Sequence, residues 1–277
     1  MIVPGSASQS LAAALSAELD EPLAAVEYDR FADGELLVRV PETAERAVVV
    51  ASTVSSDAHV ELLQLQDAAR QQADEVVTVV PYMGYGRQDK AFETGQPISA
   101  RAMAKAISTG TDRVLTVTPH EEVVCEFFDV PCESIEAAPR LAAVLPTLEA
   151  PLFLAPDDGA IDIAVAVRDA YGDGETDHFE KHRISDTEVE IAPKDAETAG
   201  RDVVLVDDIV ATGSTMSTAI SQLDDPSRVF VTCVHPMLAA SARTKLANAG
   251  VDAVYGTDTI ERAESTVSVA PILAARL

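Results

Sequence analysis

Tryptophan is absent from this 277-residue chain, lysine occurs five times and cysteine three times. Cys125, Cys132 and Cys233 form no CxxC pair and leave one thiol over, which favours neither a disulfide framework nor a zinc site. Reduced thiols are typical of the cytoplasm. No basic-then-apolar signal stretch opens the sequence, and the most apolar segment, 141–155, contains two prolines and a glutamate. We expect a soluble cytoplasmic protein with no membrane span.

Basic residues are also few: 20 Lys and Arg stand against 46 Asp and Glu, for a net charge of −26. The acids are spread along the whole chain. Such a composition is typical of adaptation to high salt, because at molar salt the Debye length is about 3 Å and surface self-repulsion is largely screened. The alternative, an acidic surface for a basic partner, is less favoured because no segment concentrates the charge. Nucleic-acid binding through a basic surface is disfavoured.

Apolar runs of strand length alternate with stretches of helical period. The runs that predict buried strands are 48–51, 76–80, 114–117, 152–154, 203–206 and 229–234. Four apolar residues at i, i+3, i+7 and i+11 predict one face of a helix: Leu62, Leu65, Ala69 and Ala73. Residues 97–109 and 239–249 predict further helices that stop at Gly110 and Gly250. Strands alternating with helices indicate an α/β fold with a mainly parallel sheet, whose ligands bind at the carboxyl ends of strands.

The most informative segment is residues 203–215, VVLVDDIVATGST. Four apolar residues lead into Asp207 and Asp208 and then into a Thr-Gly-Ser-Thr turn, followed by a predicted helix over 216–223. A strand, a loop of small residues and a helix N-terminus form a cradle for phosphate. Two carboxylates beside it could hold hydroxyls or a metal, so the segment predicts a sugar-phosphate site. The alternatives are a buried strand that merely ends in acids, and a P-loop, whose GxxxxGK[ST] spacing is absent.

Two segments in the first third of the chain carry a second set of polar residues. Residues 80–90 follow a predicted strand and contain Arg87 and Lys90, with Arg101 close behind. An arginine fork suits an anionic ligand, although ordinary surface salt bridges are the alternative. Residues 31–35, FADGE, place an aromatic ring beside two acids and are also compatible with a hairpin-like turn.

Two further segments follow strands. His120 comes just after the strand that ends at residue 117, and this position favours function, although a lone histidine is more often structural. Asp157 and Asp158 follow the next strand. Paired carboxylates suit Mg²⁺, which takes one or two protein carboxylates plus phosphate oxygens and water. The same two acids are equally compatible with a helix cap and a first-turn acid.

Residues 172–202 are rich in Gly, Asp, Glu and Thr and predict a long polar loop with Lys181, His182 and Arg183 in its middle. A mobile loop that brings two cations over an anionic site would stabilise a phosphoryl-transfer transition state and exclude water. A solvated loop with scattered charges is the alternative.

Taken together, these segments resemble the ribose-phosphate pyrophosphokinase family. The motifs that stand in that family's order and approximate spacing are FADGE, PYMGYGRQDK, QPISAR, TPHEE, PDDG, EKHR, VDDIVATGST, CVHPML and TDTI. The resemblance runs from about Phe31 to the end of the chain. GYGRQDK distinguishes it from ordinary phosphoribosyltransferases, which share only the VDDIVATGST-type loop. A halophilic, archaeal-like member also suits the acidic composition.

The resemblance implies two tandem phosphoribosyltransferase-type domains, each with a mainly parallel sheet flanked by helices. We place them at 1–142, on the ATP side, and at 143–277, with the ribose 5-phosphate loop and a catalytic flap. In such an arrangement the last helix can pack back on the N-terminal domain. The family's active site lies between the domains, and a neighbouring subunit contributes to its ATP site, so we expect a homodimer or a higher homo-oligomer.

The resemblance also assigns roles to single residues. Those expected to bind ATP are Phe31, Asp33, Glu35, Arg87, Gln88, Asp89 and His120. Those expected to bind ribose 5-phosphate are Asp207, Asp208, Ala211, Thr212, Gly213, Ser214 and Thr215. His120 and Asp157 are expected at Mg²⁺, and Lys181 and Arg183 match the catalytic flap.

Two positions depart from the better-known bacterial pattern. Thr118 stands where an Asp is usual two residues before the histidine, and Ala211 where an Asp is usual just before the Thr-Gly of the loop. The second departure argues against a general base at Ala211. Catalysis by positioning, metal and flap remains chemically sensible, because phosphoryl transfer depends mainly on alignment and charge stabilisation.

The sequence thus predicts transfer of the diphosphoryl group of Mg-ATP to O1 of ribose 5-phosphate, with release of AMP. A phosphoribosyltransferase that consumes the activated sugar is the nearer alternative, but it leaves residues 80–101 without a role. A non-catalytic regulatory homologue is the alternative from another class. Lys181, Arg183 and His120 argue against it, whereas Thr118 and Ala211 keep it open.

Overall fold

The structure, a computed structural model, describes residues 1–183, 189–194 and 196–277, with the backbone alone at 181–183 and 189–192. Contacts among Cα atoms divide the chain into two compact units. Unit 1 comprises Met1–Glu136, Asp258–Glu261 and Ser268–Leu277. Unit 2 comprises Ala137–Thr257 and Arg262–Val267. The break after Glu136 falls in a stretch rich in Pro and Ala; the boundary that we placed after residue 142 stays a prediction.

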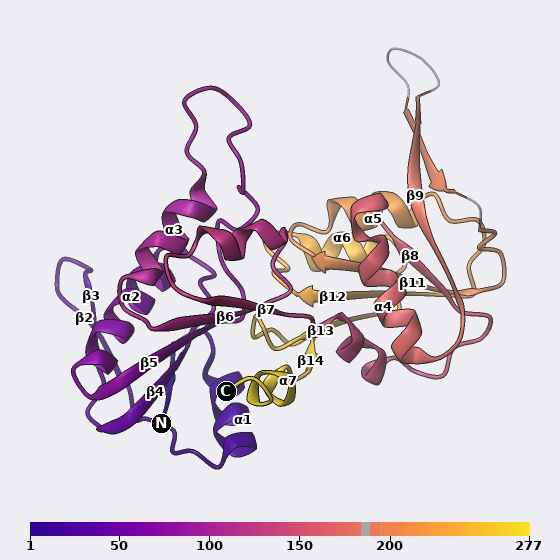
Figure 1. The fold of residues 1–277 in the computed structure, drawn as a ribbon. Helices are drawn as coiled ribbons and strands as arrows, with labels where there is room; N and C mark the ends of the chain where they lie inside the picture. Colours follow the sequence, from indigo (N-terminus) through magenta and orange to yellow (C-terminus); the bar gives the residue numbers. More distant parts are fainter. Residues whose placement is uncertain (184–188, 195) are drawn as a thin grey trace. The chain divides into compact units, whose positions relative to one another are not determined.

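Unit 1 is built on a five-stranded parallel sheet of order β1-β4-β5-β6-β7 (Figure 1). Its strands are β1 (Ile2–Pro4), β4 (Ala44–Val50), β5 (Ala73–Val80), β6 (Arg113–Val117) and β7 (Cys132–Ile135). Valine dominates the central strands, and Val48, Val49 and Val50 are fully buried. β-Branched residues suit a pleated surface, and strands covered on both faces read as continuous apolar runs. The predicted strands at 48–51, 76–80 and 114–117 are therefore confirmed: their carboxyl ends agree within one residue, whereas β4 and β5 begin four and three residues earlier than predicted.

The helices of unit 1 are α1 (Gln9–Leu19), α2 (Ser56–Arg70), α3 (Ser99–Ser108), the 3-10 helix η1 (Glu122–Phe127) and α7 (Ala270–Ala274). α7 packs on α1 within this unit. Leu62, Leu65 and Ala69 lie buried on one face of α2, as predicted. Ala73 was wrongly assigned to that face: α2 ends at Arg70, and Ala73 begins β5, where it pairs with Ala44.

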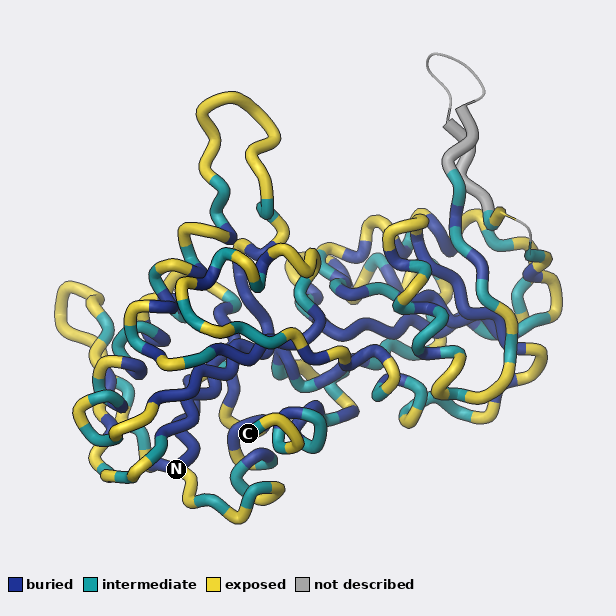
Figure 2. The backbone as a smooth tube through the Cα atoms, viewed as in Figure 1, coloured by how far each residue is buried: buried dark blue, intermediate teal, exposed yellow. Residues whose placement is uncertain are grey.

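Unit 2 is built on a seven-stranded sheet of order β10-β9-β8-β11-β12-β13-β14, counted over the described residues. The strands are β8 (Leu152–Ala155), β9 (Glu175–Arg183), β10 (Val189–Pro193), β11 (Asp202–Ile209), β12 (Arg228–His235), β13 (Ala253–Thr257) and β14 (Ser265–Val267). All neighbours pair in parallel except β9 and β10. Figure 2 shows β8, β11 and β12 as the buried centre of the unit. The predicted α/β class with mainly parallel sheets is confirmed.

The helical segments of unit 2 are η2 (Ala138–Val144), η3 (Asp158–Ala160), α4 (Ile161–Tyr171), α5 (Ser214–Ile220) and α6 (Ala242–Asn248). The helix predicted over 239–249 begins three residues late, because Leu238 and Ala240 have φ of 44° and 52°, outside the helical region. The helix predicted over 216–223 starts two residues earlier, at Ser214, and ends at Ile220.

The long loop predicted over 172–202 is wrong where β9 and β10 lie, at Glu175–Arg183 and Val189–Pro193. β9 and β10 occupy it as an antiparallel pair, with Ile191 opposite Lys181 and Val189 opposite Arg183. The strand was missed because residues 175–183 contain a single apolar residue, Phe179, and therefore no apolar run.

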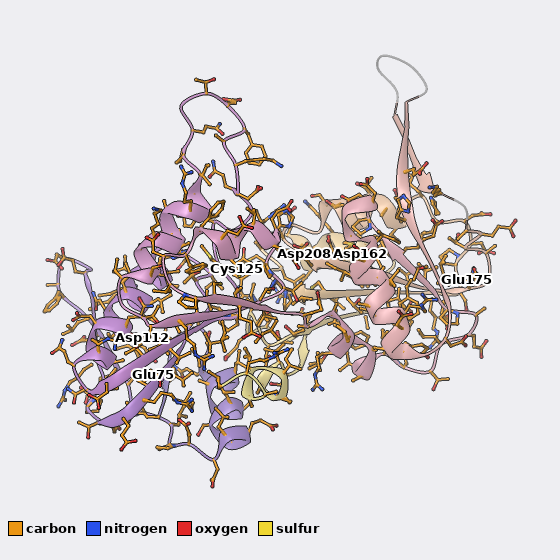
Figure 3. The ribbon with its side chains drawn as sticks, viewed as in Figure 1. Glu75, Asp112, Cys125, Asp162, Glu175 and Asp208 are labelled. Atoms are coloured by element: carbon orange, nitrogen blue, oxygen red, sulfur yellow. The ribbon has the colours of Figure 1, made fainter. Side chains whose placement is uncertain are left out.

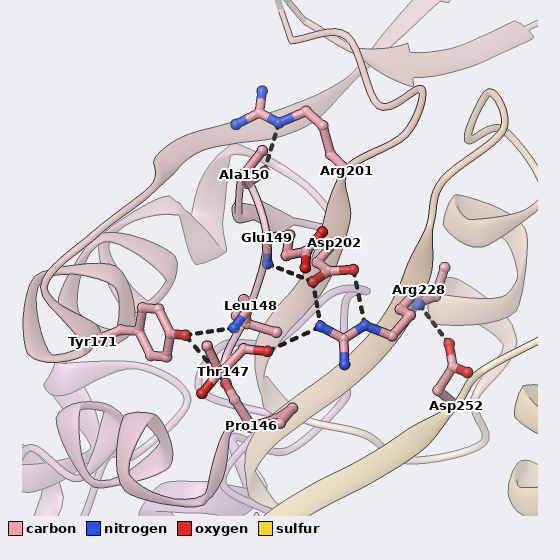
Figure 4. Close-up of polar contacts among 11 residues, drawn as sticks. Pro146, Thr147, Leu148, Glu149, Ala150, Tyr171, Arg201, Asp202, Arg228 and Asp252 are labelled. Atoms are coloured by element: carbon pink, nitrogen blue, oxygen red, sulfur yellow. Dashed lines mark hydrogen bonds and ion pairs between the residues drawn. The ribbon is translucent and has the colours of Figure 1, made fainter.

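A carboxylate at the start of β11 organises one edge of unit 2 (Figure 4). Asp202 is 1% exposed and accepts hydrogen bonds from Nε (3.0 Å) and Nη2 of Arg228, a two-pronged contact between β11 and β12. It also accepts the Glu149 N–H at 2.6 Å, and Arg228 donates to the carbonyl of Thr147 at 3.0 Å. The segment that enters β8 is thereby joined to β11 and to β12.

The Arg228 guanidinium and the Glu149 N–H hold the pKa of Asp202 below its usual value, despite its burial. A carboxyl with a lowered folded-state pKa stabilises the fold above its unfolded pKa of about 3.9, and this contribution is lost as pH falls through the folded-state pKa.

We therefore expect Asp202→Asn to lower the free energy of unfolding at pH 7 by about 2 kcal/mol, because it replaces charge-assisted bonds at a buried site. Denaturant titration in molar salt measures this. The difference from the wild type should narrow as pH falls below about 4, because the wild-type carboxyl then takes up a proton in the unfolded state before it does so in the folded state. Glu27→Gln is the control: Glu27 pairs with Arg39 in the open, at 61% exposure, and should cost less than about 1 kcal/mol. Equal losses in the two variants would contradict this account.

No helix in the described part of the chain is long and apolar enough to cross a membrane.

Candidate functional site

The predicted sugar-phosphate loop follows β11 in unit 2. The chain leaves the strand after Ile209 and turns through Ala211, Thr212 and Gly213 into α5 at Ser214. Backbone hydrogen bonds fix the loop against residues 235–239: Leu238 N–H donates to Val210 at 2.9 Å, and Ala239 N–H donates to Ala211 at 2.8 Å. The Thr212 and Ser214 hydroxyls lie 3.2 Å apart and both residues are exposed. The loop is a fixed turn that presents hydroxyls to solvent.

The glycine at position 213 cannot be replaced by another amino acid without strain in this turn. Its φ is +71°, a conformation that L side chains rarely adopt, and a Cβ there would lie 3.1 Å from the Ala242 carbonyl oxygen and 3.3 Å from Ala242 Cα. Both atoms are backbone at the start of α6. The close approach of loop and helix thus requires glycine for two separate reasons.

Two acids lie side by side at the end of β11. Asp208 is 9% exposed (Figure 3), and burial followed by repulsion from Asp208 raises the pKa of Asp207 to about 8. The charge of Asp157, at the end of neighbouring β8, adds to this repulsion. Such a group of carboxylates is stabilised by hydroxyl donors or by a cation. The structure thus brings Asp157 near the β11 acids, which the sequence had suggested only through the sheet rule.

Asp157 also has a local role. It is the N-cap of η3, and its Oδ1 accepts the Gly159 N–H at 3.1 Å. The helix cap predicted for residues 157–158 is therefore confirmed. Because Asp157 is exposed, it can cap η3 and also belong to the group of carboxylates at the end of β11. Among the described residues, no group of three or more His, Cys, Asp or Glu side chains could hold a metal ion by itself. Mg²⁺ fits such a donor set only when phosphate oxygens and water complete its coordination.

In unit 1, the residues that follow β4 form hydrogen bonds to the loop after β5 and fix its position. The Gly84 N–H donates to Thr53 Oγ1 at 2.8 Å, and the Thr53 N–H donates to the Tyr82 carbonyl at 2.9 Å. Tyr85 has φ +65°; its hydroxyl lies 2.8 Å from Ser56 Oγ, and its ring is 5.4 Å from that of the buried His59. These supports were not apparent from the sequence, because they join residues about 30 positions apart.

The fixed loop carries the predicted ATP residues. Arg87 is exposed, whereas Gln88 is tied to the start of α3: it accepts a hydrogen bond from the Ser99 hydroxyl, and the Ala100 N–H donates to its carbonyl at 3.1 Å. Asp89 is half-buried. His120 is exposed just after β6, the strand next to β5, so Arg87 and His120 follow neighbouring strands at the same edge of the sheet.

Residues 31–35 form the turn of a hairpin between β2 (Glu27–Arg30) and β3 (Leu36–Arg39). The Phe31 N–H donates to the Glu35 carbonyl at 2.9 Å, and Asp33 Oδ1 accepts the Glu35 N–H at 3.1 Å. The Phe31 ring is 54% exposed. The hairpin interpretation is thus seen, and it leaves an aromatic ring and two carboxylates displayed at the tip.

Lys181 and Arg183, which we predicted for a catalytic flap, lie in β9, but their side chains are outside the described part. Lys245 was missed by the sequence reasoning: from α6 it donates to Ser214 Oγ at 2.6 Å. Its position as one of five lysines in an acidic chain was the available signal, but its partner lies 31 residues away in sequence.

The two departures from the bacterial pattern occupy ordered backbone. Thr118 is buried with φ +36°, and its hydroxyl donates to Glu136 Oε1 at 3.1 Å. Ala211 has no side-chain carboxyl group, and its backbone carbonyl accepts a hydrogen bond from the Ala239 N–H.

Two family models match the chain: the N-terminal domain of ribose phosphate pyrophosphokinase over residues 1–110, and the phosphoribosyl transferase domain over 133–257. The ribose-phosphate pyrophosphokinase of Halobacterium salinarum is 65% identical, over 99% of each chain. That of Methanosarcina mazei is 42% identical, over 100% of this chain and 94% of the other. The crystal structure of phosphoribosylpyrophosphate synthetase from Mycobacterium smegmatis superposes with a TM-score of 0.82 at 26% identity, covering 100% and 96% of the two chains.

The fold and these matches define an α/β protein with two tandem domains of phosphoribosyltransferase type, which confirms the predicted architecture. More narrowly, the chain belongs to the ribose-phosphate pyrophosphokinase family. The acidic composition fits its similarity to the Halobacterium salinarum protein.

The strict requirement for glycine in the loop is testable. We expect Gly213→Ala to lower binding of inorganic phosphate or of ribose 5-phosphate at least tenfold, because the new Cβ displaces the loop from Ala242. Gly200→Ala is the matched control: Gly200 also has φ +71°, but no atom lies within 4 Å of its virtual Cβ. Both variants should lose about 1 kcal/mol of stability from the backbone strain alone. Calorimetric titration and thermal melting separate the effects, and equal binding by both variants would refute the role of the close approach.

Proposed function

We propose that the protein transfers the diphosphoryl group of Mg-ATP to O1 of ribose 5-phosphate, giving 5-phosphoribosyl 1-diphosphate and AMP. The single observation that carries this is similarity over essentially the whole chain to ribose-phosphate pyrophosphokinases, at 65% identity for that of Halobacterium salinarum. The alternative of a phosphoribosyltransferase is disfavoured, because the N-terminal family model that matches residues 1–110 is that of the pyrophosphokinase.

On this proposal, the loop of unit 2 holds the acceptor sugar. The hydroxyls and backbone of Thr212, Ser214 and Thr215 bind the 5-phosphate, with Gly213 allowing the loop to lie close to α6, and Lys245 supplies a positive charge beside Ser214. Asp207 and Asp208 accept hydrogen bonds from the ribose hydroxyls. Hydroxyl donors offset the burial and the repulsion from Asp208 that raise the pKa of Asp207. The sugar is thereby oriented with O1 free to attack.

The loop of unit 1 and the hairpin tip bind the nucleotide. The exposed ring of Phe31 stacks on the adenine, with Asp33 and Glu35 beside it, and Arg87 binds phosphate oxygens through its planar fork. Gln88, Asp89 and His120 complete the ATP contacts. The supports of the 82–88 segment matter here, because an arginine positioned in advance loses less entropy on binding.

The chemical step rests on alignment and charge. O1 attacks the β-phosphorus in line while Lys181 and Arg183 stabilise the charge that develops on the transferred oxygens. Mg²⁺, bound by Asp157 and His120 together with phosphate oxygens, would neutralise part of that charge. Ala211 provides no base, so positioning replaces proton abstraction by that residue. We also propose a homodimer or higher homo-oligomer in the cytoplasm, which light scattering and fractionation would check.

The reaction is tested by incubating the purified protein with both substrates and Mg²⁺ in molar salt. We expect AMP and the diphosphorylated sugar in equal amounts. Lys181→Ala should keep the melting temperature of the wild type while losing at least a hundredfold in kcat, because it removes charge from the transition state. Release of ADP, or base-dependent release of pyrophosphate, would refute the proposal. An unchanged rate in Lys181→Ala would remove the flap from the mechanism.

The role of Lys245 is tested by Lys245→Ala. Loss of one charge-assisted contact to phosphate should raise KM for ribose 5-phosphate about tenfold, equivalent to about 1.4 kcal/mol, with little change in kcat or in KM for ATP. Lys105→Ala is the control, since Lys105 is 57% exposed and pairs only loosely with Asp129, at 3.8 Å. A change confined to kcat would contradict a binding role.

A further inference from the structure

Two cysteines of unit 1 lie in contact, although their spacing in the sequence gave no sign of it. Cys125 belongs to η1 (Figure 3), and Cys132 begins β7. Their Sγ atoms are 2.7 Å apart, both side chains are half-buried, and both are free thiols. Without a CxxC motif, the sequence gave no reason to expect a contact between these thiols. The turn of η1 brings Cys125 back to Cys132, which lies seven positions later in the chain.

The surrounding backbone holds the two sulfurs in place. Cys132 pairs with Val114 in the sheet. Beyond η1, the Phe128 N–H donates to the Cys125 carbonyl at 3.4 Å and the Asp129 N–H donates to Ser108 Oγ at 3.0 Å. A disulfide bond is about 2.05 Å long. Bond formation therefore requires only a small approach of two side chains that already touch.

The two thiols are not equivalent. The hydrogen bond between the two sulfurs lowers the pKa of Cys125 and raises that of Cys132. The carboxylates of Glu122 and Glu133 act against ionisation of Cys125 and Cys132 respectively. The thiolate is the attacking species in exchange reactions, so the attacking sulfur is that of Cys125.

We propose that Cys125 and Cys132 form a reversible thiol–disulfide site whose oxidant is a small neutral or cationic disulfide. The Cys125 thiolate attacks one sulfur of the oxidant and releases the other as a thiolate. The Cys132 thiol then loses its proton, and its sulfur attacks Cys125 of the mixed disulfide, releasing the second half of the oxidant. Two protein thiols are oxidised and one disulfide is reduced to two thiols.

The preference for neutral or cationic oxidants follows from charge. Glu122, Glu126 and Glu133 flank the two thiols in a chain of net charge −26, and of the three only Glu133 has a described ion pair, with Arg276 at 3.2 Å. An anionic disulfide is repelled by this surface at low salt, and the repulsion is screened at molar salt.

The test uses the full-length protein with cystamine, bis(2-hydroxyethyl) disulfide and oxidised glutathione. Trypsin releases both cysteines in one peptide, 114–140, which contains no other cysteine, whereas fully buried Cys233 lies in 229–243. We expect peptide 114–140 to lose the mass of two hydrogen atoms, to keep no adduct, and to regain its mass with dithiothreitol. At low salt, cystamine should react at least tenfold faster than oxidised glutathione, and molar salt should reduce that ratio.

Two serine variants test the order of attack. Cys132→Ser should retain a mixed disulfide on Cys125, because the second sulfur is missing. Cys125→Ser should react at least tenfold more slowly, because the remaining thiol has a raised pKa. Three outcomes would each overturn the proposal. They are a stable adduct on the wild-type peptide 114–140, disulfide-linked dimers of the protein, and a peptide 114–140 that stays as unmodified as Cys233. Equal reactivity of the two variants would overturn the assigned order.

Discussion

Parallel pairing of valine-rich strands is the constraint on which the other features depend. β4, β5 and β6 in unit 1, and β8, β11 and β12 in unit 2, are buried and pair in parallel. Parallel pairing obliges the chain to cross back between strands, so within each unit the carboxyl ends of neighbouring strands meet at one edge. The loops after β5 and β6 and after β8 and β11 carry most of the residues that we assign to substrates. The core thus determines which short segments can act together.

The edge of unit 2 shows a second consequence of burial. Asp202 begins β11 and its pKa is lowered by Arg228, whereas Asp207, near the other end of the same strand, accepts the Asp208 N–H but has its pKa raised by burial and by repulsion from Asp208. The strand therefore carries one carboxyl group that folding favours in its charged form and another that folding disfavours in that form. Residues that destabilise the free protein in this way are commonly found where a ligand will relieve the conflict.

The sequence was sufficient for the parts of the structure that rest on local pattern. Central strands such as 203–206 were predicted because they are continuous apolar runs, and α2 because its apolar residues recur at helical spacing. β9 was missed, since it is almost entirely polar and has no apolar run, and α6 was predicted to begin too early, since positive φ at Leu238 and Ala240 leaves no trace in composition. For the candidate site, the loops were identifiable from motifs.

The contacts that support those loops could not be predicted. Lys245 contacts Ser214, and Thr53 contacts Gly84, although the two residues of each pair are 31 positions apart in the sequence. The contact between Cys125 and Cys132 depends on the 3-10 turn of η1, which has no apolar period to announce it. Each of these contacts is created by packing between elements.

The dispersed acidity has a kinetic consequence for a protein whose proposed substrates are themselves polyanions. At low ionic strength, a net charge of −26 repels ATP and ribose 5-phosphate before any contact is made. Dissolved salt shortens the range of that repulsion, so encounter becomes faster as the ionic strength rises, the reverse of the behaviour of an enzyme that attracts its substrates through a basic surface. The high salt to which the acidic surface is suited would then also increase the rate at which the protein meets its substrates.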